Sequence, residues 1–115
     1  DVSWKIQIPE HLGIPVFDIN VILSNLFENA MNAMSEVTEP SFRIIMRYDR
    51  GILCISTQNN CSGKERISGT SEEHGFGLKN IRRVAEKYHG SLTAAVRDGD
   101  FEADVLLFLE DADNE

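Results

Sequence analysis

The sequence predicts an α+β fold, a two-layer sandwich whose helices cover one face of a mixed, mostly antiparallel sheet. Three observations support this fold class: a strand-like stretch at the start, two helical stretches with apolar stripes, and hairpin signals after each of them. Helices separated by antiparallel hairpins typically pack on one face of the sheet. The length of 115 residues, 42% of them hydrophobic, suits one core, so we expect residues 1–115 to form a single domain.

The first half of the chain begins with a strand and a long helix. Residues 2–8 alternate partly between apolar and polar side chains and end at Pro9, which predicts a strand. Asp18 is a suitable N-cap for a helix that runs to about Ser35. The helix is followed by Pro40, which breaks the chain.

A hairpin and a long polar loop come next. Residues 42–48 alternate as a half-buried strand does, and residues 52–56 are the antiparallel partner after a turn at 49–51. Residues 58–73 have almost no apolar content and predict a mobile loop. A loop of this length is unusual in a compact domain unless it has a function.

The last part of the chain predicts a second helix and a second hairpin. The helix is expected from about Gly77 to a stop at Gly90. Residues 91–97 and 101–109 are two strands around Asp98-Gly99, which is a strong hairpin signal. The apolar stripe of the helix consists of Leu78, Ile81, Ala85 and Tyr88.

Charge and cysteine content exclude some classes of function. The net charge of −8 argues against nucleic acid as a partner, because a nucleic-acid surface needs a cationic stripe. A small phosphate-bearing ligand is compatible with it, since a local metal ion can outweigh the net charge. The thiols Cys54 and Cys61 are too few for a disulfide scaffold, which favours a reduced cytosolic domain. The chain has no stretch of membrane-spanning length, and because it begins at Asp1 without an initiator Met we expect an excised domain, which leaves room for a transmembrane sensor upstream.

The first helix carries a polar seam that its apolar character does not explain. At about 100° per residue, Asn25, Glu28, Asn29 and Asn32 fall within an arc of roughly 100°. Asparagine is a poor helix former and costs roughly 0.5 kcal/mol relative to alanine, so three of them suggest a function that offsets the cost. Amide oxygens are suitable ligands for Mg²⁺. The alternative is a seam that simply faces water.

The second candidate feature is the stretch from His74 to Asn80. Two glycines, Gly75 and Gly77, at a helix N-terminus let the backbone approach an anion, and the free N–H groups there favour phosphate. Lys79 and His74 can add donors. The polar loop before this stretch is suited to be a lid over a nucleotide. The alternatives are a structural tight turn and a plain disordered loop.

Taken together, these features resemble the GHKL superfamily of ATP-binding domains, and most closely the catalytic domains of sensor histidine kinases. Residues 22–30 resemble the asparagine box of that family, and residues 75–81 resemble its later glycine box. Residues 88–92 resemble the end of the following helix and the next strand. The resemblance covers nearly the whole chain in the right order, and it implies a Bergerat-type fold that binds ATP and Mg²⁺.

The resemblance also implies roles for single residues. Asn29 matches the position that ligates Mg²⁺, and Asn25 matches the other box asparagine near the phosphates. Gly75 and Gly77 match glycines whose backbone faces the phosphates, with Leu78 in the same box. Positions able to touch the terminal phosphates are matched by His74 and Lys79.

The sequence departs from the common family pattern at two places. The family usually has an Asp-x-Gly-x-Gly box, whose aspartate accepts a hydrogen bond from the adenine amino group. This chain has residues 57–63 in its place. This resembles the branch of peptide-quorum-type sensor kinases, in which an asparagine stands there. We place the adenine contact on Asn59, with Asn60 as the alternative. Many kinases of the family carry a lysine where this chain has Asn32.

The implied activity is transfer of the terminal phosphoryl group of ATP to a histidine on a separate dimerisation domain. The implied partners are that phosphoacceptor domain, a response regulator and a second copy of a homodimeric, membrane-anchored parent, with this domain in the cytoplasm. Glu28 is a candidate for orienting the site or the incoming histidine, and a structural role is the alternative. Three other functions stay open: an anti-sigma-factor-type serine kinase, an ATP-hydrolysing switch, and a degenerate nucleotide-binding docking module.

Overall fold

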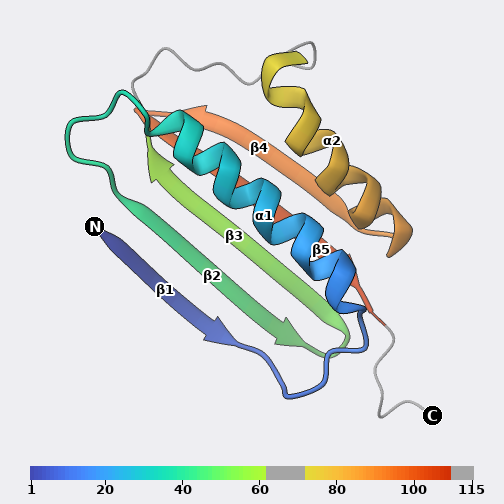
Figure 1. Cartoon of the computed structure of the whole chain (residues 1–115). Helices are drawn as coiled ribbons and strands as arrows, with labels where there is room; N and C mark the ends of the chain where they lie inside the picture. The colour runs from blue at the N-terminus through green and yellow to red at the C-terminus, as the bar shows by residue number, and fades with distance from the viewer. Residues whose placement is uncertain (62–71, 110–115) are drawn as a thin grey trace.

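The computed structural model describes residues 1–61 and 72–109, and of residues 72–76 it describes the backbone alone. Two helices lie on one face of a five-stranded sheet (Figure 1). The predicted α+β sandwich is therefore confirmed. The elements in chain order are β1 (Val2–Gln7), α1 (Val16–Ala33), β2 (Phe42–Asp49), β3 (Ile52–Asn60), α2 (Glu72–Lys87), β4 (Ser91–Arg97) and β5 (Asp100–Phe108).

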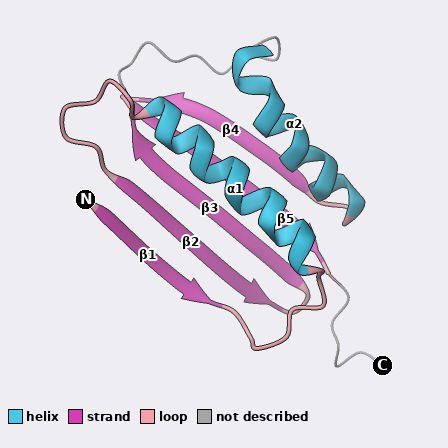
Figure 2. Ribbon diagram, in the orientation of Figure 1, coloured by secondary structure: helices cyan, strands magenta, loops and turns pink. Residues whose placement is uncertain are grey.

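The strand order in the sheet is β1-β2-β3-β5-β4. Strand β1 pairs with β2 in parallel, and the other three pairs are antiparallel, so the sheet is mixed and mostly antiparallel as predicted (Figure 2). A parallel pair needs a crossover connection, and α1 supplies it between β1 and β2. The central strands β3 and β5 run under the helices and carry the core.

The core fills the space between the helices and the sheet. On α1, a four-residue spacing aligns Ile22, Leu26 and Ala30 on the buried face. On α2, the predicted stripe is confirmed, with Val84 as an additional member. Each fully buried Leu or Ile stabilises the fold by about 1.5–3 kcal/mol. The largest fully buried side chains are Ile22, Leu26, Leu53, Ile55, Ile81, Leu107, Val105 and Asn59.

Helix α1 starts two residues before the expected cap. It begins at Val16 after Pro15, whose φ of −60° and ψ of 143° are extended and which makes no side-chain capping bond. The expectation that Asp18 caps the helix was wrong. Asp18 lies in the first helical turn and is 4% exposed, because its carboxylate is bound by side chains of the distant α2 end.

Helix α2 also starts earlier than predicted, at Glu72 instead of Gly77. Its C-terminal end is a Schellman turn, in which Gly90 N–H donates to Ala85 O at 2.8 Å and His89 N–H donates to Glu86 O at 3.0 Å. The left-handed residue is His89, with φ of 60°, and not the expected Gly90. Gly90 is needed for another reason: a Cβ there would lie 1.7 Å from the carbonyl oxygen of Leu106.

Strand β3 is longer than the sequence suggested. It continues through Gln58 to Asn60, which were expected to begin the polar loop. These polar residues stay in the sheet because β3 has a neighbour on both sides, and Gln58 Nε2 donates to Asp100 Oδ2 at 3.2 Å. The rest of the expected lid, residues 62–71, lies outside the described residues. In the described part of the chain, no helix is long and apolar enough to cross a membrane.

Candidate functional site

The asparagine seam of α1 lies along the flank that faces α2. The Nδ2 group of Asn25 donates to Val21 O at 2.6 Å, so its amide nitrogen is held by its own helix. The Asn29 side chain is half-buried, and its Nδ2 atom is buried without a hydrogen-bond partner among the described residues. Glu28 and Asn32 are exposed. A buried amide group without a partner costs free energy unless a ligand satisfies it.

Gly77 of α2 lies directly against this seam. A Cβ built on Gly77 would be 3.2 Å from Asn25 Oδ1 and 3.2 Å from Asn29 Nδ2, closer than side chains normally pack. The two features that the sequence singled out, 48 to 52 positions apart along the chain, are therefore in contact. Any side chain at Gly77 would fill the space in front of both amides.

The glycine stretch lies inside α2 and does not precede it. Because α2 begins at Glu72, the backbone N–H groups of residues 72–74 lack helical partners. Gly75, the fourth helical residue, follows directly after them, and Gly77 lies two residues further on. The expected phosphate-binding helix start is thus shifted toward the N-terminus. Of His74 the structure describes only the backbone, within the first turn.

Two further residues of the glycine box point to different surroundings. Lys79 is exposed, as a phosphate-binding cation at the rim of a site would be. Leu78 is buried in the core cluster with Ile81 and Ala85. Packing in the core is therefore sufficient to explain why an apolar residue follows Gly77.

The end of β3 provides the other polar part of the site. Asn59 points into the core side of the sheet, like Thr57 and Ile55 before it, and is only 1% exposed. Its Nδ2 group donates to Asn60 O at 2.9 Å, while its Oδ1 atom is buried and has no partner in the part of the chain that the structure describes. A buried acceptor without a donor fits a ligand group that donates a hydrogen bond.

The Asn60 side chain, the alternative for the same contact, is fully engaged elsewhere. Its Oδ1 atom accepts from Ser41 N–H at 3.0 Å, and its Nδ2 group donates to Glu39 O at 2.9 Å. Both partners belong to the connection between α1 and β2. Asn60 therefore fastens that connection to the end of β3.

These parts meet at one end of the sandwich. The C-terminal ends of α1 and β3 and the first turns of α2 lie at the same end, on the helix side of the sheet (Figure 1). The seam, Gly77 and Asn59 thus border a common region between α1, α2 and β3. Among the described residues, no group of three or more His, Cys, Asp or Glu side chains is placed so that it could hold a metal ion. A metal held at the seam would take one or two amide oxygens from the protein and its other ligands from phosphate and water.

The opposite end of the helix pair is held by a cluster that sequence reasoning missed. The carboxylate of Asp18 accepts hydrogen bonds from Tyr88 Oη and, at 3.0 Å, from Lys87 Nζ. The hydrogen bonds from Tyr88 and Lys87 hold the pKa of Asp18 below its ordinary value. Burial, together with the nearby Asp18 carboxylate, raises the pKa of Tyr88 to about 12. Tyr88 O also accepts from Phe108 N–H at 3.1 Å, so this residue ties α2 to both α1 and β5.

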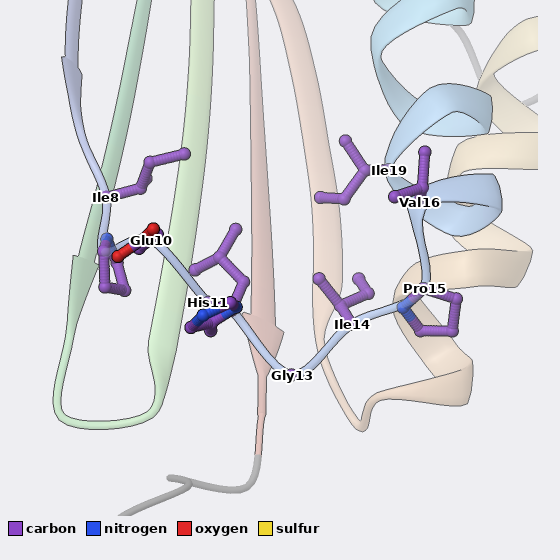
Figure 3. Close-up of a pocket in the computed structure, with 10 residues that line it drawn as sticks. Ile8, Glu10, His11, Gly13, Ile14, Pro15, Val16 and Ile19 are labelled. Atoms are coloured by element: carbon purple, nitrogen blue, oxygen red, sulfur yellow. The ribbon is translucent and has the colours of Figure 1, made fainter.

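A separate hollow of about 660 Å³ lies where β1 leads into α1. It is lined by residues 8–16 and by Ile19, and Figure 3 shows Ile8 beside Glu10 on one side of the hollow and Ile14 below Ile19 on the other. Helical rise places Asn29 about 20 Å along α1 from Val16. This hollow is therefore not part of the candidate site, in spite of its size.

The fold is similar to that of solved histidine kinase domains. The catalytic domain of the histidine kinase ThkA has a TM-score of 0.73 at 17% identity, covering 95% of this chain and 78% of that one. The histidine kinase domain of the blue-light activated kinase of Erythrobacter litoralis has a TM-score of 0.70 at 15% identity, covering 94% of this chain and 55% of that one. ThkA in complex with the response regulator protein TrrA has a TM-score of 0.71 at 17% identity, covering 96% of this chain and 34% of that one. The fold is that of histidine kinase catalytic domains.

The family of the chain follows from a comparison of its sequence with family models. A family model described as the GHKL domain matches residues 14–108, from just before α1 to the end of β5. The chain belongs to the GHKL family. A comparison with curated proteins finds no match. The chain spans about a third of the ThkA chain that was solved with TrrA, so the activity of a whole parent protein is a matter of proposal.

Proposed function

We propose that this domain binds Mg²⁺-ATP between the asparagine seam of α1 and the first turns of α2, and donates the terminal phosphoryl group to a histidine on a separate domain. The observation that carries the proposal is the contact of Gly77 with Asn25 and Asn29. It joins the two sequence features by which the GHKL family was recognised, at the end of the sandwich where Asn59 also lies.

The polar atoms at the seam fit a metal-bound triphosphate. Asn29 offers an amide whose buried nitrogen is unsatisfied by the described residues, and rotation of that amide by 180° presents its oxygen instead. Asn25 has its nitrogen tied to Val21 O and directs its oxygen toward Gly77. When bound, Mg²⁺ supplies charge neutralisation for the phosphate oxygens. Asn29 is the residue that we propose as its ligand.

Binding requires α2 to move at Gly77. A phosphate group placed between Gly77 and the seam needs more room than a methyl group, and even a Cβ would lie 3.2 Å from the amide atoms there. The C-terminal end of α2 is held by Asp18 and by the Gly90 turn, so displacement at the other end is the less costly movement. We therefore propose that the first turns of α2 swing away from α1 when nucleotide enters.

Asn59 is the proposed contact for adenine. Its free acceptor faces the core side of the sheet, and the 6-amino group of adenine is a matching donor. The Asn60 amide already makes two bonds to the connection before β2, which favours Asn59 over Asn60. Lys79, Gly75 and His74 remain proposed phosphate contacts at the start of α2.

The reaction that we propose needs no base in this domain. A neutral imidazole nitrogen attacks the terminal phosphorus, a P–N bond forms, the P–O bond to ADP breaks, and the ring N–H proton leaves to solvent. Positioning and charge stabilisation are the contributions of the protein. Glu28 is exposed on the seam flank, and we propose it only as an orienting group.

We also propose that the parent is a homodimeric sensor kinase of the peptide-quorum-type branch, with this domain in the cytoplasm and an anchor in the cell membrane. Its phosphoacceptor domain would pass the phosphoryl group to a response regulator. The likeness to ThkA, which was solved with the response regulator protein TrrA, supports the response regulator as a partner.

Titration of the chain with ATP tests the proposal. We expect binding below millimolar nucleotide in the presence of Mg²⁺, and at least tenfold weaker binding in excess EDTA. Absence of binding at millimolar ATP would contradict the proposal and favour a degenerate docking module.

The acceptor is tested by adding the dimerisation domain of the parent with γ-labelled ATP. Label on that domain that is stable in alkali and lost in acid indicates phosphohistidine. Acid-stable label on serine of a partner protein would instead indicate an anti-sigma-type kinase.

A further inference from the structure

Asn60 occupies an unusual place next to the proposed adenine contact. It is the last residue of β3, and its side chain makes both of its possible kinds of bond with the connection between α1 and β2. Its backbone N–H also donates to Ser41 O at 3.2 Å. On the other side, Cys61 N–H donates to Gly99 O at 2.9 Å. The end of β3 is thus fastened from both sides.

This fastening bears directly on the orientation of the Asn59 amide. The Nδ2 group of Asn59 donates to the main-chain oxygen of Asn60 at 2.9 Å, so the position of that oxygen decides which way the amide faces. In this orientation the Oδ1 acceptor is buried and has no partner among the described residues. If the amide rotated by 180°, it would present a donor and lose the bond to Asn60.

The two orientations select different bases. An acceptor at this point pairs with a 6-amino group, as in adenine, and opposes a 6-oxo group, as in hypoxanthine or guanine. A donor at this point does the reverse. A free amide can adopt whichever orientation suits the ligand, so it discriminates weakly between the two.

We propose that Asn60 is a positioning residue for base selectivity: by fastening the end of β3 to residues 39–41, it holds the Asn59 amide with its oxygen toward the base. The inference rests on the proposed nucleotide-binding function and adds to it the reason for adenine preference. An aspartate at position 59 would need no such device, because both of its oxygens accept.

The test compares ATP with inosine triphosphate, which carries a 6-oxo group in place of the 6-amino group. The wild-type chain is expected to prefer ATP by about tenfold, the effect of one hydrogen bond gained and one acceptor clash avoided. In Asn60→Ala this preference is expected to fall to about twofold. Affinity for inorganic tripolyphosphate should change by less than about twofold, because the phosphate contacts lie on the helices.

Ser41→Ala is the matched control. Ser41 contributes only backbone atoms to the fastening, so this variant keeps the bonds to Asn60 and should keep the wild-type preference. Asn60→Asp covers the case in which the alanine variant does not fold. It keeps an acceptor for Ser41 N–H, loses the donor to Glu39 O, and should show an intermediate preference.

The outcomes separate the inference from the function on which it rests. An Asn60 variant that folds, loses stability and keeps the full preference for ATP over inosine triphosphate would show that Asn60 is merely structural and overturn the inference. A wild-type chain that binds neither nucleotide would overturn the proposed function. A wild-type chain that binds both equally would overturn the inference and leave nucleotide binding standing.

Discussion

Gly77 of α2 lies against the Asn29 amide of α1, so close that a Cβ at Gly77 would be 3.2 Å from Asn29 Nδ2. This contact places the start of α2 over the polar seam. It also means that a nucleotide can use both features only if the helices separate locally. A substitution at Gly77 is therefore expected to affect the stability of the fold and the binding of nucleotide differently.

Gly77→Ala is expected to weaken nucleotide binding with little effect on stability. Alanine inside a helix gains about 0.8–1 kcal/mol over glycine. The new methyl group must displace amide groups at the flexible ends of two side chains, at a cost of similar size. The free energy of unfolding in urea should change by less than about 1 kcal/mol, whereas ATP affinity should fall about tenfold or more. Unchanged ATP affinity would remove Gly77 from the site.

Gly90→Ala is the contrasting substitution, just beyond the opposite, C-terminal end of the same helix. Its Cβ would lie 1.7 Å from Leu106 O and 2.7 Å from Leu106 C, which are backbone atoms of a central strand and cannot turn aside. We expect a loss of about 3 kcal/mol or more, or failure to fold. Urea denaturation monitored by circular dichroism measures it. A loss under 1 kcal/mol would show that the turn after α2 is less closely packed on β5 than described.

Tyr88→Phe is expected to cost more stability than Lys87→Met. The Tyr88 hydroxyl donates to a carboxylate that is 6% exposed, and a hydrogen bond to a charged group is worth about 1.5–3 kcal/mol. The Lys87 side chain is 60% exposed, and such ion pairs contribute about 0–1 kcal/mol. Equal losses in urea denaturation would contradict this ranking.

The cluster of Asp18, Lys87 and Tyr88 predicts that the stability of the fold depends on pH in two limbs, one acid and one alkaline. The pKa of Asp18 is lowered in the folded state, so its contribution is present above the unfolded value of about 3.9 and is lost as the pH falls through the lower folded value. The pKa of Tyr88 is raised to about 12, so its contribution is full below the unfolded value of about 10 and is lost as the pH rises toward 12.

Denaturation at a series of pH values tests both limbs. Asp18→Asn should flatten the acid limb, and Tyr88→Phe should flatten the alkaline one. A variant that retains the wild-type slope in its limb would show that other groups dominate there.

Much of the fold could be predicted from local patterns. The hairpin signals at 49–51 and 98–99 and the apolar stripes of α1 and α2 were sufficient for element order and fold class. The polar end of β3 was mistaken for loop because Gln58 and Asn59 lack strand-like side chains. Their place in the sheet depends on pairing with β2 and β5, which no local pattern reports.

The site was predictable only in part. The asparagine seam and the glycine stretch could be found, because helical spacing and residue type are visible in the sequence. Their contact through Gly77 depends on how α1 and α2 pack. Asp18 satisfied a local capping rule, but its actual partner Tyr88 is 70 positions away. The orienting bond from Asn59 to Asn60 O has no sequence signal at all.

The most direct test of the account compares Asn29→Ala with Asn32→Ala in Mg²⁺-dependent ATP binding. Both residues are asparagines on the same helix seam, but Asn29 faces Gly77 whereas Asn32 is exposed. The account predicts that Asn29→Ala folds normally and loses the effect of Mg²⁺ on ATP affinity, while Asn32→Ala keeps it. If Asn29→Ala bound Mg²⁺-ATP as tightly as the wild-type chain, Asn29 would not be the metal ligand and the proposed site would be wrong.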